Sequence, residues 1–425
     1  MQPLSGLRRP ISKAWDNGGM TSKFFRIALV LGLLSAIGPF AIDMYLPALP
    51  ALGLSLGADI GSVQMSLTAF FISLGLGQLL YGPASDLWGR KPPLYFGLVL
   101  FAISSVGCAL ATDINTLIAL RFLQGLGAAA GMVIPRAIVR DLHTGTDAAR
   151  LMSLLMLVFS VSPILAPLVG SAVIALSSWR AVFWAVTVAA LAGMAMTYTQ
   201  LQETRPATAR VESSLGSALR GYALLLRDRH YLGLVLIGSF ALSGFFIYLA
   251  NSPFVLIDHY GLTPTQYSLA FALNAAAFIG ASQFTGALGE RMGLETLVKV
   301  AASACAAVLV LLLGYYLAGG DQLAVLIALY FVASAFMGLV IPTTSVLALD
   351  HHGEIAGTAS ALLGTVQMLT GAVAMAVLSL FTDGKPLPMV VGMASGAFIA
   401  LGLTWGTLGG RPSVPPCRAA ATAPR

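Results

Sequence analysis

The chain has 425 residues, of which 57% are hydrophobic and only 9% are charged, and its mean hydropathy is +0.86. A soluble protein normally has about 25% charged residues, so this composition excludes a soluble globular protein and indicates an integral membrane protein. The net charge is +6, and its placement along the chain is more informative than its size.

The first 23 residues are polar and basic and lead directly into a long apolar segment. That segment is too long for the apolar part of a signal peptide and lacks a convincing cleavage site. We therefore expect it to be retained as the first membrane span. Met20 lies just before this span, which suggests the hypothesis that translation starts there rather than at Met1.

Twelve segments are long and apolar enough to cross a membrane, which takes about 20 residues per helix. The longest polar stretch separates the sixth segment from the seventh. The predicted spans are 24–48, 62–84, 93–111, 115–138, 151–176, 179–200, 231–254, 266–288, 295–317, 322–348, 354–381 and 387–408. The predicted units are a tail (1–23), a six-helix bundle (24–200), a linker (201–230), a second six-helix bundle (231–408) and a second tail (409–425).

Lys and Arg residues fall mainly on one side of this arrangement. Most of the 23 lie in the tails, the linker and the loops on the same side, whereas only Arg180 and Lys385 lie in loops on the other side. Because positively charged loops stay in the cytoplasm, we expect both termini to be cytoplasmic and the number of spans to be even.

The two halves of the chain share a short pattern. Residues 82–89 read GPASDLWG between spans 2 and 3, and residues 286–293 read GALGERMG between spans 8 and 9. Internal repeats are typical of transporters, in which the substrate site lies between the halves. The predicted fold class is an all-α integral membrane protein with twelve transmembrane helices in two pseudo-symmetric six-helix bundles.

The end of the first span reads AIDMYLPALP over residues 41–50 and contains Asp43. An Asp at the centre of a membrane helix costs about 2.5–3.5 kcal/mol, and less toward its ends. Ionisable groups at membrane depth usually serve function, so Asp43 is the first candidate site residue.

The stretch after the second span has the chemistry of a helix end. Gly82 and Gly89 permit close packing and a sharp turn. Asp86 can accept hydrogen bonds at a neighbouring helix N-terminus and pair with an Arg. Arg90 and Lys91 are expected to hold the loop at the cytoplasmic surface. The alternative is an ordinary positively charged turn.

Span 4 contains RFLQGLGAA at residues 121–129. Arg121 and Gln124 are one turn apart and share a helix face, and the small residues would let a second helix approach closely. Arg121 could instead extend to the membrane surface. Because Gln and small residues follow it, we expect Arg121 to face the protein interior.

Span 5 contains SPILAPLVGS at residues 162–171. Pro163 and Pro167 each remove a backbone donor and favour a bend. A bent helix suits a gate that alternates between two states, and a static kink is the alternative interpretation.

These motifs resemble those of the major facilitator superfamily. Within it the chain resembles the 12-helix drug:proton antiporter branch, and specifically the Bcr/CflA group of bicyclomycin, chloramphenicol and florfenicol exporters. The string at 82–91 is similar to the superfamily's signature between spans 2 and 3, and that at 121–129 to its span 4 motif. Pro163 to Gly170 is similar to the span 5 motif of antiporters, and the AIDMYLPALP string is the most group-specific piece.

The resemblance covers about residues 24–408 and has departures. Ala166 and Ser171 stand where the span 5 motif usually has glycines, and Leu87 stands where many relatives have Arg. The first departure leaves uniport or symport as alternatives to antiport.

The resemblance implies proton-coupled efflux of small apolar antibiotics, such as bicyclomycin or amphenicols, by alternating access. It implies a monomer in the bacterial inner membrane that uses the proton gradient and no cofactor. It further implies that Asp43 takes part in proton and drug binding and that Arg121 is coupled to that site. A change in their separation between the two states would then change the proton affinity of Asp43. The residues implied for a cytoplasmic latch are Asp86, Arg90 and Lys91, with Arg140 and Arg150 as possible partners.

The drug pocket is expected to be apolar and aromatic with few polar groups. Its candidates lie near Asp43 and in spans 4 and 7, although packing in an apolar bundle is the better explanation for each of them taken alone. They are Phe40, Tyr45, Gln124, Phe245, Phe246, Tyr248 and Asn251, with Asn274 and Gln367 as weaker additions.

Other classes of protein fit the sequence poorly. The cysteines and histidines form no metal-binding or disulfide pattern, and there is no nucleotide-binding P-loop. A membrane enzyme or receptor would need a cluster of catalytic groups at membrane depth, where we find only Asp43, Arg121 and Arg136. Within transport, the alternative to drug efflux is export of an endogenous metabolite, such as an amino acid derivative or a sugar.

Overall fold

The computed structural model describes residues 18–143, 145–205, 215–350, 352 and 355–409, and within these residues all regular structure is helical. Eleven helices are long and apolar enough to cross a membrane, or twelve if the bent pair α11 and α12 counts as one span. This agrees with the predicted all-α membrane fold. Both predicted tails lie mostly outside the described residues.

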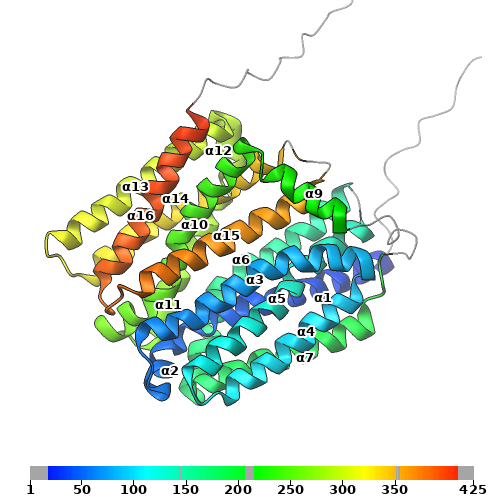
Figure 1. Ribbon diagram of the computed structural model, residues 1–425, viewed down its shortest axis with the longest axis horizontal. Helices are drawn as coiled ribbons and strands as arrows, with labels where there is room; N and C mark the ends of the chain where they lie inside the picture. Colours follow the sequence, from blue (N-terminus) through cyan, green and yellow to red (C-terminus); the bar gives the residue numbers. More distant parts are fainter. Residues whose placement is uncertain (1–17, 144, 206–214, 351, 353–354, 410–425) are drawn as a thin grey trace, which may run out of the picture.

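The long helices form two groups that lie side by side (Figure 1). The first group, here called the N-bundle, contains α1 (Gly18–Asp43), α3 (Ile60–Trp88), α4 (Lys91–Leu110), α5 (Ile114–Leu142), α6 (Gly145–Leu176) and α7 (Trp179–Gln200). The second, the C-bundle, contains α10 (Arg229–Pro253), α11 (Pro264–Ser282), α12 (Thr285–Met292), α13 (Leu294–Leu317), α14 (Leu323–Asp350), α15 (Ala356–Ser379) and α16 (Pro386–Leu408). Shorter elements are η1 (Leu46–Ala48), α2 (Leu49–Leu56), α9 (Leu215–Leu225) and the π-helix η2 (Phe254–His259).

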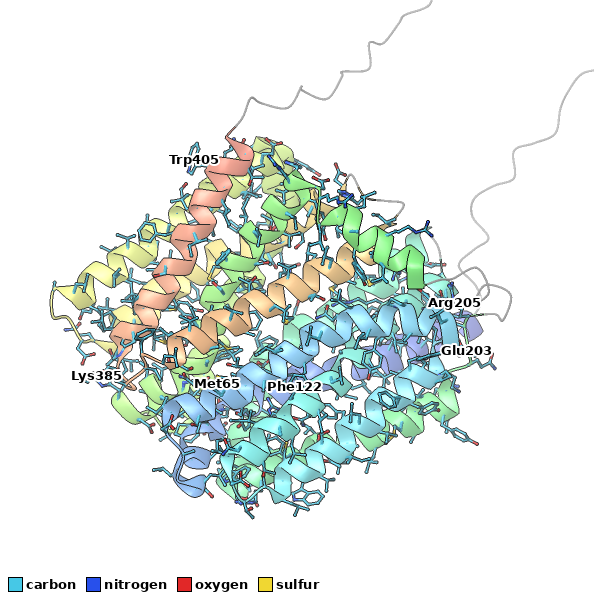
Figure 2. All side chains as sticks on the ribbon, viewed as in Figure 1. Met65, Phe122, Glu203, Arg205, Lys385 and Trp405 are labelled. Atoms are coloured by element: carbon cyan, nitrogen blue, oxygen red, sulfur yellow. The ribbon has the colours of Figure 1, made fainter. Side chains whose placement is uncertain are left out.

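The bundles meet along two helix pairs, because α3 packs against α15 and α6 packs against α11. One end of the molecule, which we call the tail face, contains the start of α1, the end of α16 and helix α9 (Figure 1). Glu203 and Arg205 lie at the tail face, whereas Met65 and Lys385 lie at the opposite end, the far face (Figure 2).

The repeated Gly pattern adopts the same backbone conformation in both halves. Gly89 follows α3 with φ of 92°, and Gly293 follows α12 with φ of 83°. Residues with a Cβ rarely adopt positive φ, whereas Gly does so readily. The two glycines therefore make equivalent sharp turns at the same point of each half.

The first membrane span, Phe24–Leu56, contains the predicted span 24–48 but is not one continuous helix. Helix α1 stops at Asp43, and η1 and α2 carry the chain onward. Pro47 and Pro50 have no N–H to donate to the carbonyl groups of Asp43 and Leu46, and a continuous helix would leave both carbonyls unpaired. The break therefore places Asp43 at a helix C-terminus inside the protein.

Two further predicted segments have internal structure that was not predicted from the sequence. The predicted span 266–288 consists of α11 and α12, which meet at an angle of 42°. At this bend the Ser282 hydroxyl donates to the Ile279 carbonyl at 2.7 Å, and such side-chain bonds compete with the helical ladder. The predicted linker 201–230 contains α9, which packs on α15 and buries Leu225.

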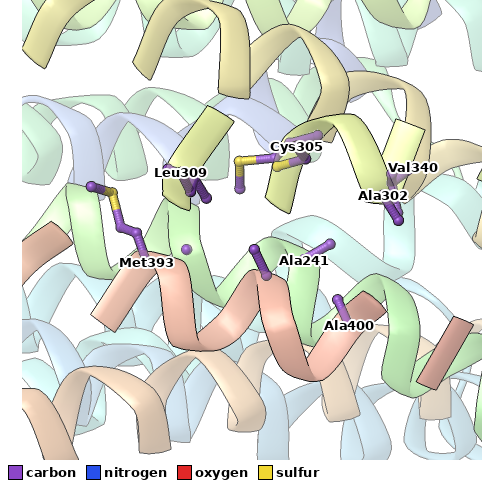
Figure 3. A pocket seen from close by; sticks show the side chains of 10 residues that line it. Ala241, Ala302, Cys305, Leu309, Val340, Met393 and Ala400 are labelled. Atoms are coloured by element: carbon purple, nitrogen blue, oxygen red, sulfur yellow. The ribbon is translucent and has the colours of Figure 1, made fainter. Parts of the chain in front are cut away.

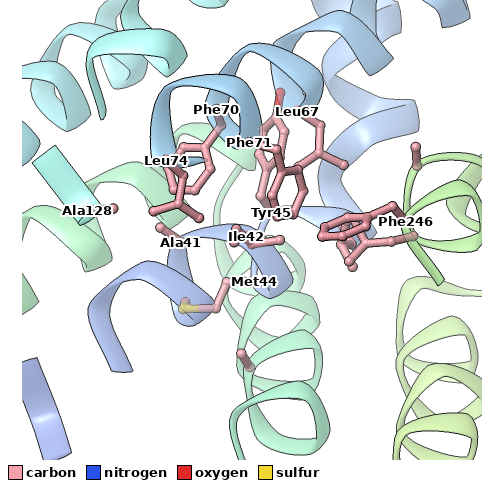
Figure 4. Packing of buried hydrophobic residues seen from close by; sticks show 14 of the residues in the cluster. Ala41, Ile42, Met44, Tyr45, Leu67, Phe70, Phe71, Leu74, Ala128 and Phe246 are labelled. Atoms are coloured by element: carbon pink, nitrogen blue, oxygen red, sulfur yellow. The ribbon is translucent and has the colours of Figure 1, made fainter. Parts of the chain in front are cut away.

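Small residues in α5 allow close helix packing, as the 121–129 motif predicted. A Cβ on Gly125 would overlap the Phe70 carbonyl of α3, and one on Gly127 would lie 2.6 Å from the Gly97 carbonyl of α4. Large apolar side chains then fill the space around the end of α1. Figure 4 shows Tyr45, Phe70 and Phe71 near the end of α1, with Phe246 of the C-bundle beside Phe71.

Candidate functional site

The break after α1 exposes backbone carbonyl groups in the interior. The Tyr45 N–H donates to the Ile42 carbonyl at 3.2 Å rather than to that of Ala41. The Ala41 carbonyl instead accepts a hydrogen bond from Nη1 of Arg121 at 3.3 Å. The C-terminal end of a helix carries partial negative charge, so the end of α1 is a favourable place for a buried cation.

Arg121 is fully buried and its guanidinium is surrounded by aromatic rings. Its central carbon lies 4.3 Å from the ring centroid of Phe70, 4.6 Å from that of Tyr45 and 5.9 Å from that of Phe183. Attraction between a cation and an aromatic face is strongest where water is excluded. This agrees with the predicted inward orientation of Arg121 and excludes the alternative of a side chain extended to the membrane surface.

Gln124 supports Arg121 rather than lining an open pocket. Its Oε1 accepts from Arg121 Nη1, and its Nε2 donates to the Ser105 hydroxyl of α4 at 2.7 Å. Nε and Nη2 of Arg121 are buried and have no hydrogen-bond partner among the described residues. Two N–H groups of the Arg121 guanidinium are therefore available to donate hydrogen bonds inside the N-bundle.

Asp43 is 5% exposed and lies two residues from the carbonyl that binds Arg121. Among the described residues, no ion pair or hydrogen bond joins its carboxyl group to Arg121 or to any other side chain. The structure therefore brings Asp43 and Arg121 to the same helix end without pairing them.

The span 5 motif packs beside Asp43. A Cβ on Gly170 of α6 would overlap the carbonyl group of Met44. One turn earlier, the Pro167 carbonyl accepts a hydrogen bond of 2.8 Å from the Ser268 hydroxyl of α11. The segment from Pro163 to Gly170 therefore contacts both the break in α1 and the other bundle.

The predicted pocket residues lie in several different environments. Tyr45 bonds to the Ser66 hydroxyl at 2.8 Å and faces Arg121 inside the N-bundle. Phe246 meets Phe71 across the interface at a centroid distance of 4.5 Å. Phe40 and Phe245 are half-buried.

Tyr248 lies in an aromatic cluster inside the C-bundle. Its ring stacks on Tyr330 at 4.0 Å, and its hydroxyl accepts a hydrogen bond of 2.9 Å from Asn274. Asn251 bonds to residues of both bundles at the far face. Gln367 is nearly buried and lies beside Gly238. Apolar composition identified interior residues, but it did not give the faces on which they lie.

Two hollows in the structure lie away from these residues. The first is a cavity of ≈ 10 Å³ within the C-bundle, between residues that include Ala241, Cys305 and Met393 (Figure 3). It is too small for a drug, and such apolar cavities stay dry. The second is an apolar groove of ≈ 340 Å³ on the N-bundle surface, lined by residues that include Tyr81 and Trp88.

The signature between spans 2 and 3 forms a charge cluster at the tail face. Arg90 Nη1 lies 2.7 Å from Asp86, and its Nε lies 2.7 Å from Asp141 of α5. Arg205 lies 3.6 Å from Asp86. Burial alone would lower the pKa of Arg90, but the hydrogen bond and charge of Asp141 hold that pKa above its usual range. Pairing of Asp86 with an Arg agrees with the prediction.

Arg90 is only 4% exposed, because it forms ion pairs with Asp86 and Asp141. One prediction about this loop is wrong. Asp86 does not cap the next helix. Glu203 does so, accepting from the backbone N–H groups of Arg90 at 2.9 Å and Lys91 at 3.1 Å. Sequence reasoning missed Asp141 and Glu203, since neither stands in a motif.

The two proposed latch partners lie apart. Arg140 lies beside Gly357, at the start of α15, so it reaches the other bundle at the tail face. Arg150 lies 6.0 Å from the ring of Phe24 in its own bundle. Within the described part of the chain, no group of three or more His, Cys, Asp or Glu side chains could hold a metal ion.

The family model of the Major Facilitator Superfamily matches residues 31–375. The uncharacterized MFS-type transporter YdgK of Bacillus subtilis is 38% identical over 82% of this chain and 87% of its own length. The bicyclomycin resistance protein homolog of Haemophilus influenzae is 29% identical over 89% of this chain and 94% of its own.

A chloramphenicol resistance protein of Pseudomonas aeruginosa is 28% identical over 88% of this chain and 89% of its own. Among solved structures, the D-xylose–proton symporter aligns with a TM-score of 0.69 at 17% identity, covering 89% of this chain and 97% of the symporter, which shows a shared fold. The chain is thus a multi-pass transporter rather than an enzyme, and it belongs to the major facilitator superfamily.

Proposed function

We propose that the protein exports small, mainly apolar antibiotics, such as bicyclomycin or amphenicols, in exchange for protons. The observation that carries this proposal is Asp43, a nearly buried carboxyl group at the broken end of α1 that forms no ion pair or side-chain hydrogen bond with the described residues. A buried carboxylate is costly unless it is paired or protonated. Asp43 therefore suits a group that binds a proton in one state and gives it up to a competing drug in another.

The energetics of this exchange are adequate. One proton exchanged for one neutral drug moves one charge, which is worth about 2.3 kcal/mol per 100 mV of membrane potential. That energy supports a drug gradient of about 50-fold, since about 1.4 kcal/mol corresponds to a factor of ten. No nucleotide or other cofactor is needed in this scheme.

The proposed orientation and location of the protein follow from the distribution of charged residues and from the bacterial relatives. The tail face is cytoplasmic, in agreement with the placement of most Lys and Arg residues, and the membrane is the bacterial inner membrane. We expect the protein to act as a monomer, because each chain would hold a complete site between its two bundles.

A resistance assay tests the drug part of this proposal. The protein is expressed in a drug-sensitive bacterial strain, and the minimal inhibitory concentrations of bicyclomycin, chloramphenicol and florfenicol are compared with those of an empty-vector strain. A rise of fourfold or more for at least one compound is expected. No rise for any compound, with the protein present in the membrane, would contradict drug export and favour export of an endogenous metabolite.

A further inference from the structure

Three polar side chains join the bundles at the far face, and we call them the far-face polar cluster: Gln64, Asn251 and Thr382. Oδ1 of Asn251 accepts a hydrogen bond of 2.9 Å from Gln64 Nε2 and another of 2.9 Å from the Thr382 hydroxyl. Gln64 Nε2 also donates to the Ala250 carbonyl at 3.2 Å. Gln64 belongs to α3 of the N-bundle, whereas the other residues belong to the C-bundle, so these bonds cross the interface.

The orientation of Asn251 is determined by its own helix. Its Nδ2 donates to the Ile247 carbonyl of α10 at 2.9 Å, which directs Oδ1 toward the N-bundle. Gln64 and Asn251 are both buried. The contact is therefore a built feature of the interface and not a chance meeting of two surface side chains.

The backbones around this cluster approach closely. A Cβ on Gly61 of α3 would lie 2.9 Å from the Ser379 carbonyl at the end of α15. The Ser379 hydroxyl lies 3.9 Å from the sulfur of Met65. Figure 2 shows Met65 at the same end of the molecule as Lys385. The two bundles are thus in contact at the far face in this structure.

Because its groups are polar, this contact favours the closed state over the open state only weakly. When the bundles separate, water replaces each lost hydrogen bond, so one such bond favours the closed state by only about 2- to 10-fold. Oε1 of Gln64 is buried without a partner, which further disfavours closure. An apolar contact of the same size would remain closed, because opening would expose it to water.

We propose that Gln64, Asn251 and Thr382 form a reversible gate at the far face, which must open for substrate to pass through that side of the membrane. The open and closed states of the gate are close in free energy, so small changes in the far-face polar cluster shift the open-to-closed ratio. Asn251 acts in this gate by closing the path, and it is not a drug contact.

Distance measurements between spin labels test the gate directly. Labels are attached to cysteines at Ser55 of α2, which precedes α3 of the N-bundle, and at Lys385, which precedes α16 of the C-bundle. Both positions are exposed, and the native cysteines are replaced first. Double electron–electron resonance then reports the short-distance and long-distance populations. The measurement needs no substrate, so its failure would not be confused with failure of the proposed drug export.

Two variants should shift these populations in opposite directions. Asn251→Ala leaves Gln64 and Thr382 without their shared acceptor, so the open-to-closed ratio should rise about tenfold. The double variant Gln64→Leu with Asn251→Leu replaces the polar contact by an apolar one, so the long-distance population should fall below that of the wild type. Thr382→Val removes one donor and should give a smaller rise in the same direction as Asn251→Ala.

Asn274→Ala is the matched control, because Asn274 is a buried amide whose bond to Tyr248 lies within the C-bundle. It should leave the distance distribution unchanged. If Asn251→Ala folds and gives the wild-type distribution, the gate is refuted. If Asn251→Ala does not fold, the distance distribution of Thr382→Val is used instead. A distribution equal to that of the wild type would then refute the gate.

Discussion

Arg121 donates a hydrogen bond to the backbone carbonyl of Ala41, 3.3 Å away, and forms no ion pair with Asp43 only two residues further along the chain. The cation is thus held by a helix end and by aromatic rings rather than by a carboxylate. Asp43 and Arg121 can therefore move relative to each other without breaking a direct bond between them.

Lysine should not replace Arg121. An ammonium group lacks the planar face that stacks between Tyr45 and Phe70 and cannot donate to Ala41 and Gln124 in the same geometry. We expect Arg121→Lys to lower the stability by about 1–3 kcal/mol, the cost of leaving buried hydrogen-bonding groups such as the Ala41 carbonyl unpaired. Thermal unfolding in detergent measures this loss. A melting temperature equal to that of the wild type would contradict the described environment of Arg121.

Gly170 should tolerate no side chain, because a Cβ would overlap the carbonyl group of Met44 and separate α6 from the broken end of α1. We expect Gly170→Ala to lower the melting temperature and to reduce transport. Gly280→Ala is the control, since a Cβ on Gly280 of α11 meets no atom within 4 Å. Equal behaviour of the two variants would show that the contact between Gly170 and Met44 is unimportant.

The sequence predicted those features that depend on local rules. Membrane helices must satisfy their backbone hydrogen bonds internally, so long apolar segments gave the helices of both bundles. The position of Gly89 indicated the sharp turn after α3, whereas the break after Asp43 was not predicted, because the predicted first span ran five residues past the end of α1. The small residues at 121–129 indicated a close helix contact.

Features that depend on distant residues were beyond this reasoning. Asp141 and Glu203 reach Arg90 from 51 and 113 residues away, and no local pattern connects them. The direction in which Asn251 points depends on the rotation of α10, and a helix that is apolar on all sides does not reveal that rotation. Apolar composition was therefore enough to find interior residues but not to group them into a pocket.

Asp141 should be important for the stability of the tail face. Arg90 is buried and bonds to Asp141 through both Nε and Nη2. Asp141→Ala leaves these donors unpaired, which should cost about 1–3 kcal/mol. Asp383→Asn is the comparison, because Asp383 pairs with Lys385 at 3.9 Å in an exposed position, where ion pairs contribute little. Thermal unfolding of both variants distinguishes them, and similar losses would contradict the account of the cluster.

Acid should weaken a second cluster, in the loop before α14. The Tyr260 hydroxyl donates to Asp321 at 2.6 Å and holds the pKa of that carboxyl group below its usual range. A carboxyl group with a lowered pKa stabilises the folded state above its unfolded pKa of about 3.9, and this stabilisation is lost as the pH falls through the folded value.

The wild type should therefore be more stable than Asp321→Asn at pH 6, and the difference should shrink toward pH 3. Melting temperatures across this range test the prediction. A difference that stays constant with pH would show that the charge of Asp321 does not stabilise the fold.

The most direct test of the central claim is drug-induced proton release from inverted membrane vesicles that contain the protein. Wild type is compared with Asp43→Asn and with Asp59→Asn, a control at an exposed carboxylate that caps α3. We predict that a drug active in the resistance assay releases protons with the wild type and with Asp59→Asn, and that folded Asp43→Asn gives no signal. An unchanged signal in Asp43→Asn would contradict the account, because the proton would then be carried by another group.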